Sequence, residues 1–192
     1  MTQNPDRQHP IIFALSQLHQ RFIDQIGEFP AVEFDPCWRS RCESGKLDQD
    51  DQLIWQPVQQ TTTLDFSGLA RAAEESIHAD IKAYFGGFWS ATLSTSAEEG
   101  EVNLIQLWNE EDFHRLIENL IGHLLLKRRQ RRPFSVFFAN TEINSDLFLT
   151  INNQDGSIWL EAPGKKPLRQ VEANLAAFLT RLQPLNQSPN LY

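Results

Sequence analysis

The sequence predicts an α+β domain in which about four helices pack on a mostly antiparallel or mixed β-sheet. Apolar residues recur every three or four positions in some segments and alternate with polar residues in others, and short turns link most of the strand-like segments. The 192 residues, 41% of them hydrophobic, suit one domain over residues 1–192 with its own core. Residues 186–192 are expected to form a loose tail.

The first helix is predicted to begin at Pro10 and to end at Gly27, because proline suits the first helical turn and glycine the residue after the last. Its apolar stripe is Ile11, Leu15, Leu18, Phe22 and Ile26. From residue 28 to residue 52 two prolines, a glycine and several charges occur without a clear period, which predicts a long loop.

Residues 53–58 are predicted to form a short strand, with Pro57 at a sheet edge or strand end. A second helix is expected over residues 69–85. Its apolar stripe is Leu69, Ala73, Ile77 and Ile81, and Gly86 and Gly87 would end it.

Residues 88–95 and 102–108 are predicted to pair as a hairpin around a turn at 96–100. Asn109 then has the properties of an N-cap, since three acidic residues follow it in the first turn of a third helix. Gly122 would interrupt this helix. A glycine in a helix costs ~1 kcal/mol relative to alanine, so Gly122 predicts that another element approaches the backbone closely.

Three more strands are expected at residues 134–139, 146–151 and 157–161, with the turn Asn153–Gly156 joining the last two. A final helix should carry Val171, Leu175, Phe178 and Leu182 and stop before Pro184.

The net charge of −8 is unevenly distributed along the chain. Residues 1–47 sum to −1, residues 48–118 to −11 and residues 119–192 to +4. An acidic protein is a poor binder of phosphate backbones, so nucleic acid is not expected as a partner. No apolar run could span a membrane, and the first ten residues lack the apolar centre of a signal peptide. A cytoplasmic protein with Cys37 and Cys42 as reduced thiols is therefore expected.

The common sequence signatures of catalysis are absent. The chain has no phosphate-binding glycine loop, no His-Glu-x-x-His and no Gly-x-Ser-x-Gly. Neither an enzyme nor a small-molecule substrate, cofactor or metal site is expected. The histidines are scattered, and His123, in an apolar helical turn, is more readily explained by the core or by a groove edge than by acid–base catalysis.

Each acidic cluster taken alone is explained by solvated helix and turn faces. Taken together, 14 acids against 3 bases over residues 48–118 exceed what solubility needs, which favours one acidic surface for a basic partner. The basic residues Lys127, Arg128, Arg129, Arg131 and Arg132 have two compatible interpretations, a helix C-terminus and a contact with anionic lipid.

The chain carries its most specific motifs in Trp108–Phe113 and above all in Glu118–Leu124, together with Pro36–Cys37, Ile54–Pro57, Ala173–Leu179 and Pro184–Leu185. In these segments, and in their order, it resembles the Syd family of SecY-interacting proteins. The resemblance extends over nearly the whole chain and is most specific from residue 101 to residue 185.

The resemblance implies a SUKH-superfamily fold and a cytoplasmic, non-enzymatic protein. It also implies that an acidic concave surface binds basic loops of SecY at the cytoplasmic face of the inner membrane, and that the protein monitors or modulates assembly of the export channel. An immunity-type inhibitor that binds a basic toxin or nuclease through the same face is the alternative. The residues expected to bind the partner are Asp50, Asp51, Glu74, Glu75, Asp80, Glu98, Glu99, Glu101, Glu110, Glu111 and Glu118, with Trp55 and His123 in the groove wall.

Overall fold

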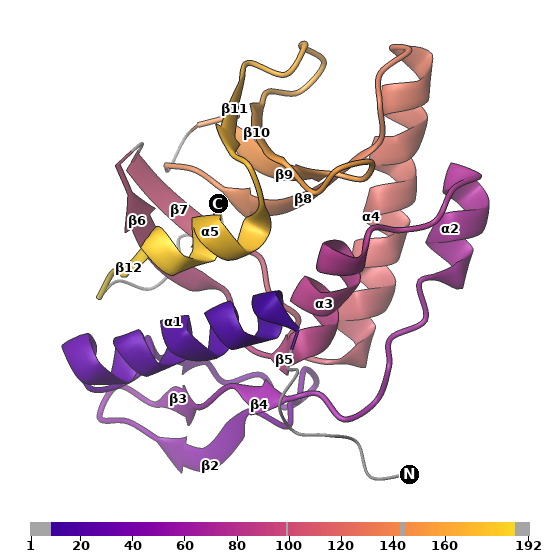
Figure 1. Cartoon of the computed structure of the whole chain (residues 1–192). Coiled ribbons are helices and arrows are strands. Elements are labelled where there is room, and N and C mark those ends of the chain that lie inside the picture. The colour runs from indigo at the N-terminus through magenta and orange to yellow at the C-terminus, as the bar shows by residue number, and fades with distance from the viewer. Residues whose placement is uncertain (1–8, 99, 143–144, 187–192) are drawn as a thin grey trace, which may run out of the picture.

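The computed structural model describes residues 9–98, 100–142 and 145–186 and confirms the α+β class (Figure 1). Its helices are α1 (Pro10–Ile26), α2 (Ser67–Ala73), α3 (Ala79–Gly87), α4 (Glu110–Arg129) and α5 (Leu175–Arg181). The main sheet is antiparallel, with the strand order β11-β10-β9-β8-β7-β6-β12.

The strands of the main sheet are β6 (Leu93–Ala97), β7 (Gly100–Leu104), β8 (Ser135–Asn140), β9 (Phe148–Asn152), β10 (Ile158–Glu161), β11 (Arg169–Glu172) and β12 (Gln183–Pro184). A small sheet with the order β1-β3-β2 contains β1 (Val32–Glu33), β2 (Glu43–Leu47) and β3 (Gln52–Trp55), and β4 (Val58–Gln59) pairs with β5 (Phe88–Trp89).

The helices cover the curled main sheet from two directions. Helix α1 lies against α3, α5 and strand β12, whereas α4 runs along β8 and contacts α2 (Figure 1). Phe138 of β8 makes edge-to-face contacts with Tyr84 of α3 and Phe178 of α5. These aromatic contacts join both helices to the centre of the sheet, within one continuous hydrophobic core.

The ends of the two longest helices are confirmed. Pro10 is the first residue of α1, and Gly27 ends it in the left-handed region at φ 94°. The Asn109 side chain accepts the Asp112 amide and caps α4.

The second predicted helix is wrong in its continuity. Its apolar stripe is buried as expected, but the helix breaks after Ala73, where Glu74 adopts φ 60°, and restarts at Ala79. Asn153 holds the break, because its side chain donates to the Ser76 carbonyl and accepts from the His78 amide. This contact comes from the β9–β10 turn, so the spacing of apolar residues along the helix could not predict it.

Other expected boundaries also change. Residues 28–52 contain β1 and β2, whose side chains are mostly exposed and therefore show no apolar alternation. The strands expected at 53–58 and 88–95 are each divided in two, and Arg169–Glu172 forms β11 where the start of a helix was expected. Gly122 does not interrupt α4, and a Cβ added there would meet nothing within 4 Å, so the close approach predicted at Gly122 is wrong.

Lys127 does not belong to the lipid-contact group, because its side chain is buried. Its ammonium pairs with Glu161 of β10, whose other oxygen accepts from Ser135 and Thr150. Burial alone would raise the pKa of Glu161, but Lys127 and the two hydroxyls together lower it. The contribution of the pair to stability is therefore complete above pH 4.5 and is lost as the pH falls further.

Replacing Glu161 by glutamine should lower the free energy of unfolding by about 3–5 kcal/mol, because it leaves the Lys127 charge buried without its partner. The double variant Lys127→Met/Glu161→Gln should recover much of this loss, since no charge remains and the amide still accepts from Ser135 and Thr150. Urea unfolding measures both. Equal losses in the single and double variants would show that the two charges are not coupled.

His19 on α1 makes folding sensitive to mild acid. Its side chain is buried against Phe29 and Phe88, and burial lowers its pKa from 6.5 to about 4. The unfolded chain therefore takes up a proton below pH 6.5 that the folded chain rejects until about pH 4.

The free energy of unfolding should fall by about 2 kcal/mol from this group alone between pH 7 and pH 5. The variant His19→Leu should lose that part of the pH dependence in urea titrations at the two pH values. The exposed His114→Gln is the control and should retain the fall seen in the parent. If the free energy of unfolding of His19→Leu falls between pH 7 and pH 5 as much as that of the parent, His19 is not the source of this pH dependence.

Candidate functional site

The acidic residues expected to form one surface lie on separate parts of the molecule. Asp50 and Asp51 are in the turn between β2 and β3, Glu74 and Glu75 are between α2 and α3, and Asp80 opens α3. Glu98 and Glu101 are at the β6–β7 hairpin, and Glu110, Glu111 and Glu118 are in the first half of α4. Figure 1 shows these elements at different sides of the fold, so they do not all line one concavity. Glu99 lies outside the described residues.

The described residues form a groove of about 660 Å³ between the small sheet and the start of α4. One wall is formed by β1 and the segment that follows it, and the other by residues 90–92 and the segment 106–112. The lining residues are Val32, Glu33, Phe34, Asp35, Pro36, Trp38, Ser90, Ala91, Thr92, Gln106, Trp108 and Asp112. We call this concavity the acidic groove, because three carboxylates and no cationic side chain line it.

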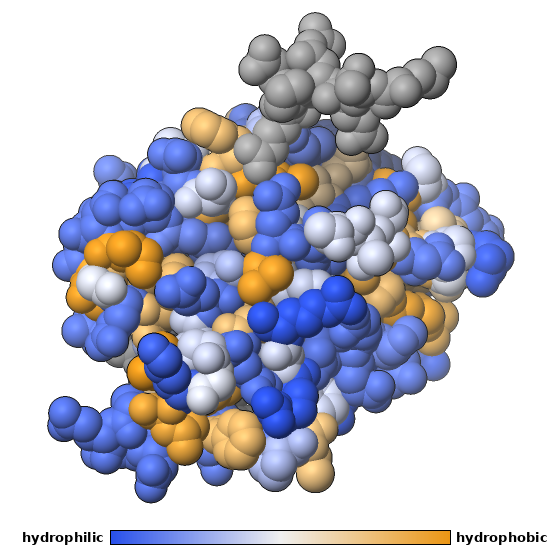
Figure 2. Space-filling view, turned by 90° about the horizontal axis from the view of Figure 1, so that it is seen from below, coloured by the Kyte–Doolittle hydropathy of each residue, from blue (hydrophilic) through white to orange (hydrophobic). Residues whose placement is uncertain are grey.

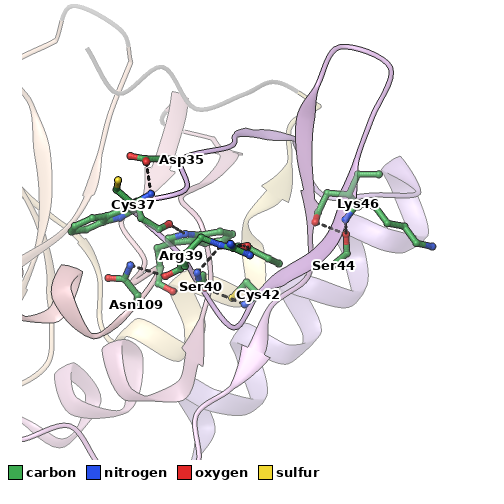
Figure 3. Close-up of polar contacts among 12 residues, drawn as sticks. Asp35, Cys37, Arg39, Ser40, Cys42, Ser44, Lys46 and Asn109 are labelled. Atoms are coloured by element: carbon green, nitrogen blue, oxygen red, sulfur yellow. Dashed lines mark hydrogen bonds and ion pairs between the residues drawn. The ribbon is translucent and has the colours of Figure 1, made fainter.

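Hydrogen bonds fix the segment 35–42 against the start of α4 (Figure 3). The Asn109 side chain donates to the Arg39 carbonyl at 2.9 Å, and the Trp108 indole donates to the Trp38 carbonyl at 3.0 Å. The Ser40 hydroxyl donates to the Trp108 carbonyl. The same residues that begin α4 therefore also position one wall of the acidic groove.

The arginines beside the acidic groove are engaged by other groups, two of them by carboxylates outside the groove lining and two by aromatic rings that line it. Arg39 pairs with Glu43 at 2.7 Å, and Arg41 pairs with Glu110 at 2.8 Å. The Arg115 guanidinium lies over the Trp38 ring, 3.9 Å from its centroid. Glu33 and Asp35 are both exposed and make no ion pair with any residue that the structure describes.

Asp112 links the acidic groove to the α4 cap. Its carboxylate accepts from the Trp108 amide at 2.9 Å, one residue earlier than in a regular capping box. Burial raises the pKa of Asp112, although the Trp108 amide and Arg115 act in the opposite direction. The buried amide of Gln106, which also lines the groove, lies near the Tyr84 hydroxyl, but its nitrogen finds no acceptor at hydrogen-bonding geometry.

The small sheet, which forms one wall of the acidic groove, lies on one side of the molecule (Figure 1). Figure 2 views the molecule from this side and shows a mainly hydrophilic surface with small hydrophobic patches between polar residues. Phe34 is 38% exposed and lines the groove with Trp38 and Trp108. Carboxylates next to aromatic faces form an environment that attracts lysine and arginine side chains.

Trp55 and His123, both expected in a groove wall, do not line the acidic groove, although His123 lines a separate concavity of about 450 Å³. Trp55 is only 2% exposed, makes an edge-to-face contact with Trp108 and donates to the Pro30 carbonyl, so it supports the groove from within the core. His123 is half-buried on α4, where its ring meets Phe137 and Phe148 edge-on and its Nε2 lies 3.4 Å from the Ser135 hydroxyl. Burial lowers the pKa of His123 to about 4, which keeps the ring neutral at neutral pH.

In the described part of the chain, no group of three His, Cys, Asp or Glu residues is arranged to hold a metal ion. Among the same residues, no helix has both the length and the apolar composition needed to cross a membrane.

A family model described as "Syd protein (SUKH-2)" matches residues 12–184. The chain is 34% identical to Protein Syd of Pseudoalteromonas atlantica over 165 residues, covering 85% of this chain and 88% of that protein. It is 37% identical to Protein Syd of Shewanella frigidimarina, covering 88% of this chain and 78% of that one. The chain belongs to the Syd family. The similarity to Protein Syd of Colwellia psychrerythraea, 34% over 176 residues, covers 87% of each chain.

Within this Syd-family fold, Trp108 and Asp112 line the acidic groove, and both belong to the segment Trp108–Phe113 that carries part of the resemblance. Sequence reasoning missed Glu33 and Asp35. Their signal is present as an alternation of Val32, Glu33, Phe34 and Asp35, but Arg39 and Arg41 follow closely and cancel the local charge.

Replacing Asn109 by alanine removes both the helix cap and the bond to the Arg39 carbonyl. The free energy of unfolding should fall by about 1–2 kcal/mol, and the amides of residues 35–42 should exchange with deuterium faster. Asn119→Ala, an exposed change within α4, is the control and should alter both by much less. Unchanged exchange in residues 35–42 would show that Asn109 does not hold this segment.

Proposed function

We propose that this protein binds SecY without catalysing a reaction, and that the acidic groove receives a basic segment of a cytoplasmic SecY loop. Membership of the Syd family supports the choice of partner. The groove supports the chemistry, because three carboxylates and no cation line it. Binding would take place at the cytoplasmic face of the inner membrane and would let the protein monitor or modulate assembly of the channel.

The observation that carries this proposal is the pairing of nearby arginines with other carboxylates. Arg39 and Arg41 are held by Glu43 and Glu110, so they do not neutralise Glu33 and Asp35. A lysine or arginine entering the groove would meet open carboxylates at its rim and tryptophan at its wall. The acids outside the groove would act at longer range, by steering a basic partner toward the protein at low salt.

Neutralising the groove rim with Glu33→Gln and Asp35→Asn should weaken binding about tenfold at low ionic strength, because two uncompensated charges are lost and the side-chain shapes are kept. The difference should shrink as salt is added. Binding is measured with SecY reconstituted in vesicles of phosphatidylcholine, which offers no net lipid charge.

The matched control is Asp50→Asn with Asp51→Asn, which changes the charge equally in the exposed β2–β3 turn. It should bind within about twofold of the parent. Equal losses in both variants would favour a diffuse acidic field over the groove. Parent-like binding by the rim variant would reject the groove. If the protein ignores SecY and captures a basic toxin domain, the immunity-type alternative is correct.

A further inference from the structure

A second surface of opposite charge lies at the other end of α4. Arg128, Arg129 and Arg131 are exposed around the C-terminus of this helix, and Lys165 and Lys166 are exposed in the loop between β10 and β11. Figure 1 places the helix end and this loop at the same end of the molecule. We call these residues, with Arg132, the basic end.

Backbone contacts assemble the basic end from two distant parts of the sequence. The Arg132 guanidinium donates to the carbonyls of Gly164 and Lys165, which fixes the β10–β11 loop beside the helix. The Arg132 amide in turn donates to the Lys127 carbonyl at 3.0 Å, closing the helix in a Schellman motif. Cations from both segments therefore keep a defined arrangement.

Arg131 occupies the left-handed position of this motif, at φ 53°. Glycine is the residue usually found there, because a side chain is strained in that conformation. Compared with glycine, arginine at this position lowers local stability and adds one more exposed cation. Helix capping alone therefore does not explain why an arginine is found there.

Most of the charge at the basic end is uncompensated. Arg128 pairs with Glu74 at 3.4 Å. Among the residues that the structure describes, no carboxylate forms an ion pair with Arg129, Arg131, Lys165 or Lys166. The acidic groove is far away, since the 20 residues of α4 span roughly 30 Å, whereas salt screens charges beyond about 8–10 Å.

Large apolar side chains are exposed among these cations. Leu168 in the β10–β11 loop is 52% exposed, and Leu125 and Leu126 in the last turns of α4 are 49% and 42% exposed. Leu125 precedes Arg128 and Arg129 by three and four residues and so shares their helix face. Nucleic acid offers phosphates but no apolar layer. A bilayer offers both, with phosphates at its surface and hydrocarbon just below them.

We propose that the basic end docks on an anionic lipid bilayer, with its cations at the headgroup phosphates and Leu168 and Leu125 dipping between the headgroups. The surface differs from the one expected from sequence, because Lys127 is excluded by burial and Lys165, Lys166 and Leu168 join it. This contact does not depend on the acidic groove. The contact involves lipid alone, so it would strengthen membrane attachment when a protein partner is bound at another surface.

The test uses the full chain and vesicles without any protein. The parent should co-sediment with vesicles of phosphatidylcholine and phosphatidylglycerol, should do so less as salt increases, and should leave vesicles of pure phosphatidylcholine in solution. The variant Arg129→Gln/Arg131→Gly should partition about 20-fold or more weakly, at roughly fivefold for each cation. Glycine at position 131 relieves the backbone, so this variant should fold at least as well as the parent.

Lys46→Gln/Lys82→Gln is the control, with the same change of charge at exposed positions on β2 and α3. It should bind vesicles like the parent, as should the rim variant Glu33→Gln/Asp35→Asn. Leu168→Ser should weaken binding at high salt, where the apolar contact remains. Equal binding by the control and the Arg129/Arg131 variant, or tighter binding to RNA than to anionic vesicles, would overturn the proposal.

Discussion

The buried ion pair between Lys127 of α4 and Glu161 of β10 is the constraint on which both candidate surfaces depend. It ties the last turns of α4 to β10, which is next to the edge strand of the main sheet, and the Asn109 cap with its bond to the Arg39 carbonyl ties the first turn to the segment 35–42. A buried pair contributes little net stability compared with an apolar core. In this pair, Glu161 bonds to Lys127 of α4 and to Ser135 and Thr150 of the sheet at once, so a shift of the helix along the sheet would break these bonds. A helix fixed in this way holds the acidic groove at its start and the basic end at its finish.

The sequence predicted those elements whose signals are local. Helix α1 has a stripe of apolar residues, a proline at its start and a glycine after its end, and α4 has its cap and its terminal charges. The division between α2 and α3 was not predictable, because Asn153, which holds it, comes from a turn about 75 residues away. Strands β1 and β2 were missed for a different reason. Their side chains face mostly solvent, so apolar and polar residues do not alternate along these strands.

Charge counted along the sequence predicted the acidic character but not the place of the groove. The count missed Glu33 and Asp35 because Arg39 and Arg41 follow them, yet these arginines are engaged by Glu43 and Glu110. It also placed Lys127 in a surface group, although that lysine is buried with its partner. In each case the pairing of charges is decided by tertiary structure, so a sum over neighbouring residues cannot show which charges remain open.

The charges at the two ends of α4 are also those that its own dipole favours. Acids at a helix N-terminus and bases at its C-terminus each contribute roughly 0.3–1 kcal/mol, so Glu110, Glu111, Arg128 and Arg129 are explained without any partner. Glu33 and Asp35, and likewise Lys165, Lys166 and Leu168, lie on other segments, so they do not cap α4. Each set adds its charge to that of the side chains at the nearby end of α4, and this addition distinguishes a binding surface from helix capping. Function is best tested at these residues, because their replacement leaves the helix unchanged.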